Sequence, residues 1–376
     1  MRVLVCPDKF AGTLSAPQAA AAVAEGWLTT AAADDLLLRP LSDGGPGFVA
    51  VLAAGIGGRL LSVATVDPLG RPVTGEILLV GDTAYVESAQ ACGLHLLTSA
   101  ERDPKTTTSY GLGVLLLAAV EAGARRVVVG LGGSATNDAG AGMLAALGAA
   151  PLDHAGYALP YGGAALAAAV ALDGAPRLRQ VDLVAATDVD NPLAGLHGAS
   201  NIYGPQKGAS REDVFLLDAA LERFAVVLQA LPTAPAGLAG LPGAGAAGGI
   251  GAAILALGGR CESGIGLVTR LTGLAQALDT ADLVITGEGS FDHQSLRGKV
   301  VAGVAAGARD RGLPCLVLAG QVAAGRREAA AAGVTEAYAL VDHFGGAEHG
   351  GLERAMADPA GGLRAISARL AGQWSR

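Results

Sequence analysis

Short apolar runs that end in turns rich in glycine and acidic residues recur along this chain, and most of these turns lead into a helical pattern. A repeated strand, turn and helix is typical of parallel sheets covered by helices. Residues 59–86 differ, because apolar and polar residues alternate there between the turns DPLG and GD, which predicts antiparallel strands. The glycine- and alanine-rich segment after Asp342 is expected to end in a short surface helix.

The length of the chain and this change of pattern predict two α/β domains. A chain of 376 residues, 51% of them apolar, is longer than one hydrophobic core usually serves. The shift from strand–helix units to antiparallel strands places a domain boundary near residues 60–70.

Composition excludes several classes of protein. The net charge of −8 argues against a nucleic-acid partner. The long uncharged stretches are broken by glycine and proline, which predicts no membrane partner, and the apolar run before Pro7 is too short for a signal peptide. Four widely spaced cysteines without a CxxC motif fit a cytoplasmic protein that has no structural zinc.

Five predicted loops at strand ends share glycine together with Asp, Asn, Ser or Thr. Ligands of open α/β sheets bind beyond the carboxyl ends of the strands, and glycine lets backbone N–H groups approach a phosphate. The pattern alone assigns none of the loops to a particular ligand. The loops are PDKFAGT (7–13), SDGGPG (42–47), GGSATNDAG (132–140), TDVDNP (187–192) with GPQKG (204–208), and TGEGSFD (286–292) with RGK (297–299).

One of these loops also suggests a nicotinamide dehydrogenase. The sequence GLGGSA (130–135) matches G-x-G-x-x-A, the dinucleotide fingerprint. That site needs an acidic residue at the end of the next strand, about 20 residues further on. Asp153 has this spacing, but the sequence around it does not have a strand pattern. The dehydrogenase therefore stays an alternative that rests on GLGGSA.

The residue types in the other loops fit phosphoryl transfer better. This reaction needs cations near the moving phosphoryl group, oxygen ligands for Mg²⁺ and a base for the acceptor hydroxyl. Asp188, Asp190 and Asn191 follow a predicted strand and could supply the metal ligands or the base. An equally simple interpretation is that these residues form a turn before Pro192.

Lysine is scarce in this chain, which draws attention to the lysines in the loops. Only four of the 26 basic residues are lysines, and Lys207 lies between two glycines while Lys299 follows one at a helix start. Both are candidates for phosphate contacts. Glu288 and Asp292 lie in the loop before Lys299, although Asp292 could also cap a helix.

Taken together, the motifs resemble those of the bacterial class I glycerate kinases over nearly the whole chain. They occur in family order as PDKFxGTLSA, SDGGxG, TTSYGLG, GLGGSATNDAGAGMLAALG, DVDNPLxGxxGAxxxxGPQKGA, PGAGAAGGIGAA and DLVITGEGxxDxQSLxGKV. The resemblance implies ATP-dependent phosphorylation of D-glycerate with Mg²⁺, with 2-phosphoglycerate as the favoured product.

The resemblance also implies a fold of two α/β domains with a cleft between them. Residues 1–65 and 280–376 would form a Rossmann-like domain with a mainly parallel sheet. Residues 66–279 would form a second α/β domain, inserted within the first and carrying glycine-rich loops.

Site residues follow from the positions that match the family motifs. The expected catalytic residues are Asp188, Lys207, Asp292 and Lys299, and the expected metal ligands are Asp188 and Asp190. The expected substrate or phosphate contacts are Asp8, Lys9, Asp43, Gly44, Gly45, Gly132, Gly133, Ser134, Thr136, Asn137, Asp138, Asn191, Gly287 and Glu288.

The chain departs from the family pattern at four positions. Ala11 replaces a usual lysine, Pro46 a usual glutamate, Phe48 a common threonine and Ala139 a glycine. The first two changes remove charged groups from candidate loops, and proline also removes a backbone N–H. A homologue that binds small molecules with weakened catalysis is therefore a further alternative.

Overall fold

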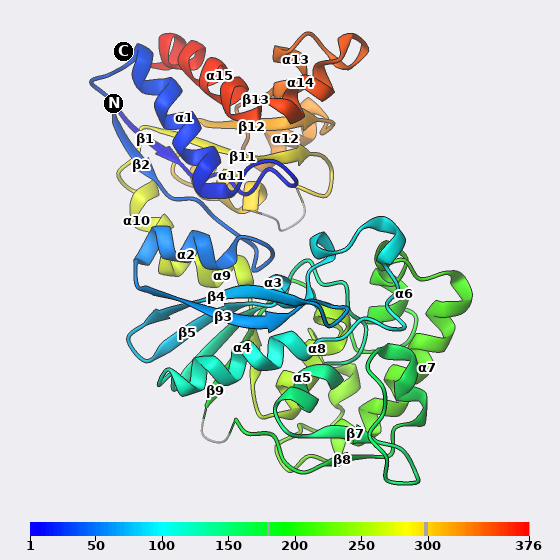
Figure 1. Cartoon of the computed structure of the whole chain (residues 1–376). Helices are drawn as coiled ribbons and strands as arrows, with labels where there is room; N and C mark the ends of the chain where they lie inside the picture. The colour runs from blue at the N-terminus through cyan, green and yellow to red at the C-terminus, as the bar shows by residue number, and fades with distance from the viewer. Residues whose placement is uncertain (179–180, 297–299, 376) are drawn as a thin grey trace. The chain divides into compact units, whose positions relative to one another are not determined.

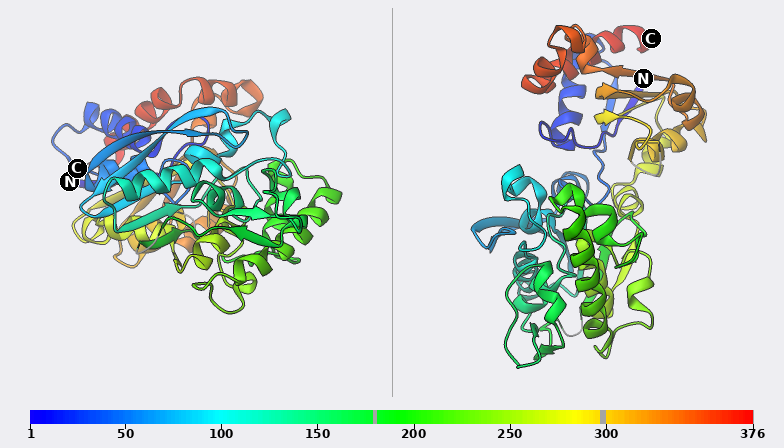
Figure 2. Two further views of the ribbon diagram at one scale, coloured as in Figure 1. Left: turned by 60° about the horizontal axis from the view of Figure 1, so that its bottom comes forward. Right: turned by 90° about the vertical axis from the view of Figure 1, so that its right-hand side faces the viewer.

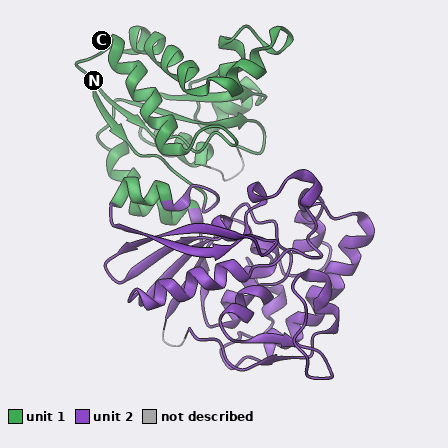
Figure 3. Cartoon of the chain, in the orientation of Figure 1, with its two compact units in different colours: residues 1–43, 50–56, 265–376 green, residues 44–49, 57–264 purple. Residues whose placement is uncertain are grey.

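The computed structural model describes residues 1–178, 181–296 and 300–375 and has an α/β fold (Figure 1). The chain forms two compact units, each with its own sheet, and the second is inserted within the first (Figure 3). This confirms the predicted fold class. Unit 1 comprises residues 1–43, 50–56 and 265–376, and unit 2 comprises residues 44–49 and 57–264. The predicted domain limits stay a prediction, because a division of the chain by its internal contacts does not show that each part folds by itself.

Unit 1 is built on a five-stranded parallel sheet in the order β13-β12-β11-β1-β2. Its strands are β1 (Arg2–Val5), β2 (Asp35–Leu38), β11 (Leu283–Phe291), β12 (Cys315–Val322) and β13 (Glu336–Ala339). The helices in or beginning at the margin of this unit are α1 (Ala16–Thr30), α2 (Phe48–Ile56), α9 (Gly264–Leu271), α10 (Leu274–Leu278), α11 (Val300–Arg309), α12 (Arg326–Ala332), α13 (Leu340–His343), α14 (Gly351–Ala357) and α15 (Pro359–Trp374).

Helices α1 and α15 pack together on one face of this sheet, and α11 covers the other face (Figure 1, Figure 2). The sequence SAPQ (15–18) predicts a capping box at the start of α1, and the structure contains it. The Ser15 side chain accepts from the Gln18 N–H, and the Gln18 side chain accepts from the Ser15 N–H. Trp27 is fully buried where α1 faces the sheet, and its Nε1 donates to Asp34 at 2.9 Å.

Helix α15 corrects the prediction of a short surface helix. It has 16 residues, and Leu363, Ile366 and Leu370 are buried against α1 and the sheet. Small residues allow this, since a Cβ atom on Gly26 of α1 would lie 2.2 Å from the Arg364 carbonyl oxygen. The glycine and alanine content therefore reflects close helix packing rather than surface exposure.

Strand β11 extends further than the sequence suggested. The apolar pattern predicts a strand over 282–289 with the loop TGEGSFD (286–292) at its end, but β11 pairs with β12 as far as Phe291. Gly287 permits this pairing, because a Cβ atom there would lie 2.0 Å from the Leu318 carbonyl oxygen. Glu288 therefore projects from a strand rather than from a loop.

Unit 2 has a mixed six-stranded sheet in the order β10-β9-β6-β5-β4-β3. The antiparallel pairs β3–β4 and β4–β5 confirm the pattern predicted for residues 59–86, and the remaining pairs are parallel. A large apolar cluster lies between this sheet and its helices. The strands of the unit are β3 (Arg59–Val66), β4 (Pro72–Val80), β5 (Thr83–Glu87), β6 (Arg126–Gly130), β7 (Ala150–Leu152), β8 (Ala171–Asp173), β9 (Asp182–Ala186) and β10 (Arg260–Glu262).

Helices α4 and α8 of unit 2 pack against its sheet (Figure 1). None of the helices in the described part of the chain combines the length and apolar character needed to cross a bilayer. The α-helices are α3 (Ala89–Cys92), α4 (Tyr110–Glu121), α5 (Ala141–Ala146), α6 (Ala199–Tyr203), α7 (Arg211–Gln229) and α8 (Ala246–Ala256).

The contact between α1 and α15 makes a matched pair of glycine substitutions informative. Gly26→Ala should lower the free energy of unfolding by about 1–3 kcal/mol, because the added methyl overlaps the α15 backbone. Gly303→Ala, on the exposed face of α11 with no atom near the new methyl, should instead raise it by about 0.5–1 kcal/mol. Urea unfolding measures both, and equal effects would show that α15 does not pack as described.

Candidate active site

Two of the predicted loops lie in direct backbone contact in unit 2. The Gly132 N–H donates to the Gly44 carbonyl at 3.1 Å, and a Cβ atom on Gly132 would lie 2.3 Å from the Gly45 Cα. Gly133 has φ +73°, and a Cβ atom there would lie 2.8 Å from the Pro46 ring. The loops SDGGPG and GGSATNDAG therefore form one surface, and their backbones approach this closely because Gly132 and Gly133 have no side chain.

The far end of the loop 132–138 is fixed by a buried carboxylate. Asp138 is fully buried and accepts from the Ser109 N–H and Oγ, and from the N–H groups of Gly140 and Gly142. Burial raises the pKa of Asp138, and these hydrogen bonds oppose the shift. The Asp138 carboxylate therefore holds the loop in place through hydrogen bonds within the protein.

Lys207 is brought to the same loop from the end of the short 3-10 helix Pro205–Lys207. Its side chain is 2% exposed, and Nζ donates to Ser134 Oγ at 3.0 Å and to the Thr136 carbonyl at 2.7 Å. Burial lowers the pKa of Lys207 to about 8, while the negative charge of Asp138 acts in the opposite direction. The loop therefore holds a desolvated cation, which strengthens its electric field for an anion.

The side chains of Thr136 and Asn137 are buried beneath the loop surface. Asn137 is fully buried, and its Nδ2 donates to Ser200 Oγ at 2.9 Å. Thr136 Oγ1 and Asn137 Oδ1 are buried and have no hydrogen-bond partner among the residues that the structure describes. A bound water or a substrate hydroxyl could pair with these atoms.

The third region of unit 2 follows strand β9. Asp188 and Asp190 are exposed there, and Ser263 Oγ donates to Asp188 Oδ1 at 2.6 Å. Asn191 Oδ1 accepts from the Tyr203 hydroxyl at 2.6 Å and Nδ2 donates to the His197 carbonyl at 2.9 Å, so this side chain holds the loop together. Among residues 1–178, 181–296 and 300–375, no group of three or more His, Cys, Asp or Glu side chains is placed to hold a metal ion.

Unit 1 brings five of the remaining predicted residues to one cavity of about 360 Å³: Asp8, Lys9, Asp43, Glu288 and Asp292. Lys9 lies beside two carboxylates there, with Nζ 3.7 Å from Asp8 Oδ1 and 3.8 Å from Asp43 Oδ1. Glu288 and Asp292 also line this cavity. Gly287 contributes through its backbone, because its carbonyl accepts from the Asp8 N–H at 2.8 Å.

Asp292 is held by hydrogen bonds to its own turn. Asp292 Oδ1 accepts from the Gln294 N–H at 2.7 Å and from the Ser295 N–H at 3.3 Å, as in an Asx turn. This carboxylate therefore both lines the cavity and shapes the chain after β11. Lys299 lies outside the described residues.

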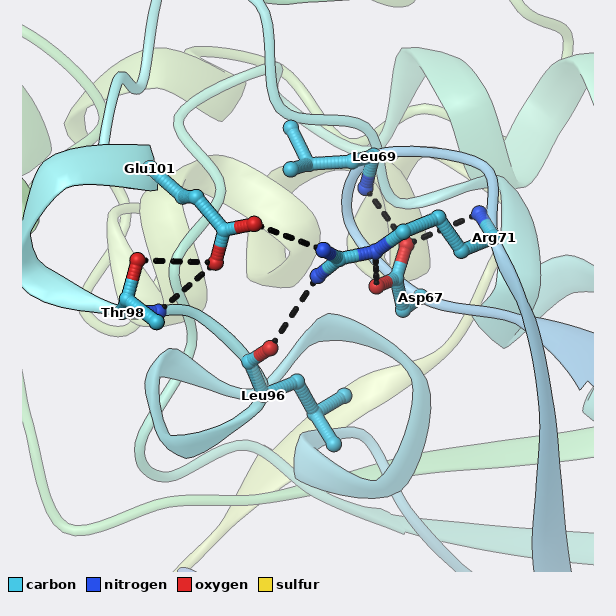
Figure 4. A network of polar contacts seen from close by, with 6 residues as sticks. All are labelled: Asp67, Leu69, Arg71, Leu96, Thr98 and Glu101. Carbon is cyan, nitrogen blue, oxygen red and sulfur yellow. Dashed lines mark hydrogen bonds and ion pairs between the residues drawn. The ribbon is translucent and has the colours of Figure 1, made fainter.

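A network of polar contacts centred on Arg71 joins the turn after β3 to residues 96–101 (Figure 4). The Arg71 guanidinium donates to Asp67 at 2.5 Å, to Glu101 at 2.7 Å and to the Leu96 carbonyl at 3.2 Å. The same segment is also bonded to the 132–138 loop, because the Leu94 N–H donates to the Gly133 carbonyl at 2.9 Å.

Sequence reasoning missed the other wall of the unit 1 cavity. Leu340, Leu352, Met356 and Pro359 line it from α13, α14 and the start of α15. These residues lie far from the recognised motifs in the sequence and belong to no pattern that predicts a site. Ser109, by contrast, lies within the motif TTSYGLG and could have been singled out there.

An α/β fold in which glycine-rich loops surround a buried cation is the arrangement expected of a phosphotransferase. The model of the glycerate kinase family matches residues 3–375. The glycerate 2-kinase of Escherichia coli (strain K12) is 38% identical over 328 residues, which cover 86% of each chain. An uncharacterised protein of Mycobacterium tuberculosis (strain CDC 1551 / Oshkosh) is 42% identical over 378 positions, covering 99% of this chain and 91% of the relative.

A solved structure agrees with these relatives. A protein assigned as glycerate kinase 2 in Salmonella typhimurium LT2 superposes with a TM-score of 0.81 at 36% identity, covering 99% of this chain and 98% of the other. The chain belongs to the glycerate kinase family. This confirms the family expected from the motifs and the prediction of a kinase, and the family uses ATP as the phosphate donor.

The buried ammonium of Lys207 predicts how stability depends on pH. Between about pH 8 and pH 10.5 the folded chain has released this proton while the unfolded chain keeps it, so the free energy of unfolding should rise with pH. Relative to Lys207→Met, the free energy of unfolding of the wild type should rise by up to about 1 kcal/mol per pH unit in this window. Below about pH 8 the difference between the two proteins should stay constant. Parallel pH profiles of the two proteins in urea unfolding would contradict the burial of a charged Lys207.

Proposed function

We propose that this chain transfers the γ-phosphoryl group of ATP to the 2-hydroxyl group of D-glycerate, giving 2-phosphoglycerate and ADP. The observation that supports this most directly is the buried Lys207 ammonium held against the 132–138 loop, in a member of the glycerate kinase family. A preorganised cation beside glycine backbone suits the charge that develops on a transferred phosphoryl group.

In this proposal Lys207 acts largely through Ser134. The Ser134 Oγ accepts a hydrogen bond from the ammonium, so its single O–H is directed to another partner. The ammonium has three N–H donors, and the bonds to Ser134 and Thr136 use two of them. Ser134, the third donor of Lys207 and the backbone at Gly132 and Gly133 are proposed to bind the anionic groups of glycerate and of the transferred phosphoryl group.

The transfer itself is a displacement at phosphorus. The 2-hydroxyl oxygen of glycerate forms a bond to the γ-phosphorus while the bond from that phosphorus to the bridging oxygen of ADP breaks. The hydroxyl proton leaves to a carboxylate or to solvent, and the charge on the three equatorial oxygens stays within reach of the cation. Lys207 and the loop 132–138 would hold the reacting oxygens in line and limit their contact with water.

Mg²⁺ is proposed to bind at Asp188 and Asp190. Mg²⁺ prefers oxygen ligands and commonly binds through one or two carboxylates together with substrate phosphates and water. The two exposed carboxylates beyond β9 fit this donor set. When bound, the ion would neutralise charge on the nucleotide phosphates. The bond from Ser263 would fix the orientation of the Asp188 carboxylate.

The product of the reaction can be identified directly. Purified protein incubated with MgATP and D-glycerate should release ADP and form a phosphate monoester with the ³¹P resonance of 2-phosphoglycerate. The resonance of 3-phosphoglycerate would correct the position of transfer. Absence of ADP release from folded protein that binds MgATP would favour a homologue that has lost turnover, for which Ala11 and Pro46 are the first positions to restore.

Asp188→Asn tests the metal site. Loss of one carboxylate should lower kcat by about 10²–10³-fold and raise the Mg²⁺ concentration needed for half-maximal rate. Asp173→Asn, an exposed carboxylate at the end of β8, is the matched control and should behave as wild type. Steady-state rates over a range of Mg²⁺ concentrations give both values, and a kcat within about twofold of wild type would remove Asp188 from the mechanism.

A further inference from the structure

The cavity of unit 1 has two walls of different chemistry. One wall is polar and is formed by residues at the carboxyl ends of the strands, among them Asp8, Lys9 and Asp43. The other wall is apolar and is formed by residues from α13, α14 and the start of α15. At about 360 Å³ the cavity is within the range of pockets that enclose a whole small ligand, about 300–1,000 Å³.

The apolar wall has a buried base and an exposed rim. Leu340 and Ala355 are 1% and 5% exposed and form the base. Leu352 and Met356, one helical turn apart on α14, are 43% and 53% exposed. Large apolar side chains exposed beside a polar loop are a common feature of binding sites.

Glycerate gives no reason for such a wall. Each of its three carbon atoms carries oxygen, so it has almost no surface that gains from contact with leucine or methionine. The other substrate of the proposed reaction does have such a surface, because a purine base presents two flat apolar faces. Methionine suits such a face, because its side chain is flexible and its sulfur interacts favourably with aromatic rings.

We propose that the apolar wall formed by Leu340, Leu352, Ala355, Met356 and Pro359 binds the adenine base of ATP, an assignment that rests on the proposed function. The base lies against Leu352 and Met356, and the ribose and phosphates extend toward the polar wall. Lys9, which Asp8 and Asp43 hold in place, supplies a cation there for the phosphate chain.

The assignment separates the roles of the five loops, which the sequence left open. The loop after β1, Asp43 after β2 and the end of β11 serve the nucleotide, since they line this cavity. The 132–138 loop with Lys207 then serves glycerate and the transferred phosphoryl group. Nucleotide specificity is accordingly a property of the C-terminal helices of unit 1, a part of the chain outside the recognised motifs.

A double variant, Leu352→Gln with Met356→Gln, tests the base site without adding charge. Calorimetry should show about tenfold weaker binding of MgADP, because two apolar contacts to the base are replaced by polar ones. Binding of magnesium tripolyphosphate, which has no base, should stay within about twofold of wild type. Leu28→Gln is the matched control, because Leu28 is a 40% exposed leucine of α1 in the same unit that does not line the cavity.

The possible outcomes separate this proposal from the proposed reaction. Wild-type turnover of D-glycerate with unchanged MgADP affinity in the double variant would overturn the base site and leave the reaction standing. Weaker MgADP binding in the double variant, together with no turnover of D-glycerate by the wild type, would support the base site and overturn the acceptor. Equal losses for MgADP and tripolyphosphate would show that the wall supports the fold rather than the base, and would overturn the proposal.

Discussion

The buried carboxylate of Asp138 fixes the end of the 132–138 loop to two helices of unit 2. It accepts hydrogen bonds from the start of α4 through Ser109 and from the start of α5 through Gly140 and Gly142. Both helix N-termini present N–H groups and partial positive charge, which stabilise an anion without water. The same carboxylate favours the charged form of Lys207, so the cation can remain buried beside the loop. Burying two opposite charges in one region adds little net stability, and the value of these two groups lies in fixing one arrangement of the loop.

The glycines around this loop act mainly through close backbone approach. A Cβ atom on Gly248 would lie 1.9 Å from the Thr136 carbonyl oxygen, and the Ala139 N–H donates to the Gly248 carbonyl at 2.9 Å. The segment PGAGAAGGIGAA therefore packs behind the 132–138 loop and supports it. Ala139 itself has φ +47°, a conformation that glycine adopts without steric cost, so this departure from the family pattern carries a small strain.

The sequence predicted the parts of this structure that depend on local patterns. The antiparallel strands of residues 59–86, the capping box of α1 and the glycine turns after strands are local features, and the structure contains them. The extension of β11 and the burial of α15 depend on partners far away in the chain, β12 and α1, which periodicity does not reveal. For the same reason the sequence identified site residues without showing which of them lie together. Lys207 and Ser134 are 73 residues apart in the chain but are hydrogen-bonded. The apolar wall of the unit 1 cavity comes from the C-terminal helices.

The two departures in charged loops affect the structure differently. Ala11 lies on the wall of the unit 1 cavity, where Lys9 already provides a cation, so the charge is reduced but not lost. Pro46 packs on Gly133 and takes part in the shape of the 132–138 loop. A carboxylate remains at this turn, because the buried Glu87 accepts from the Val49 N–H at 3.3 Å. Pro46 also has a fixed φ and no N–H, so it stiffens the turn that faces the loop. The loss of the glutamate is thus accompanied by a more rigid loop support, which favours preorganisation of the site rather than its decay.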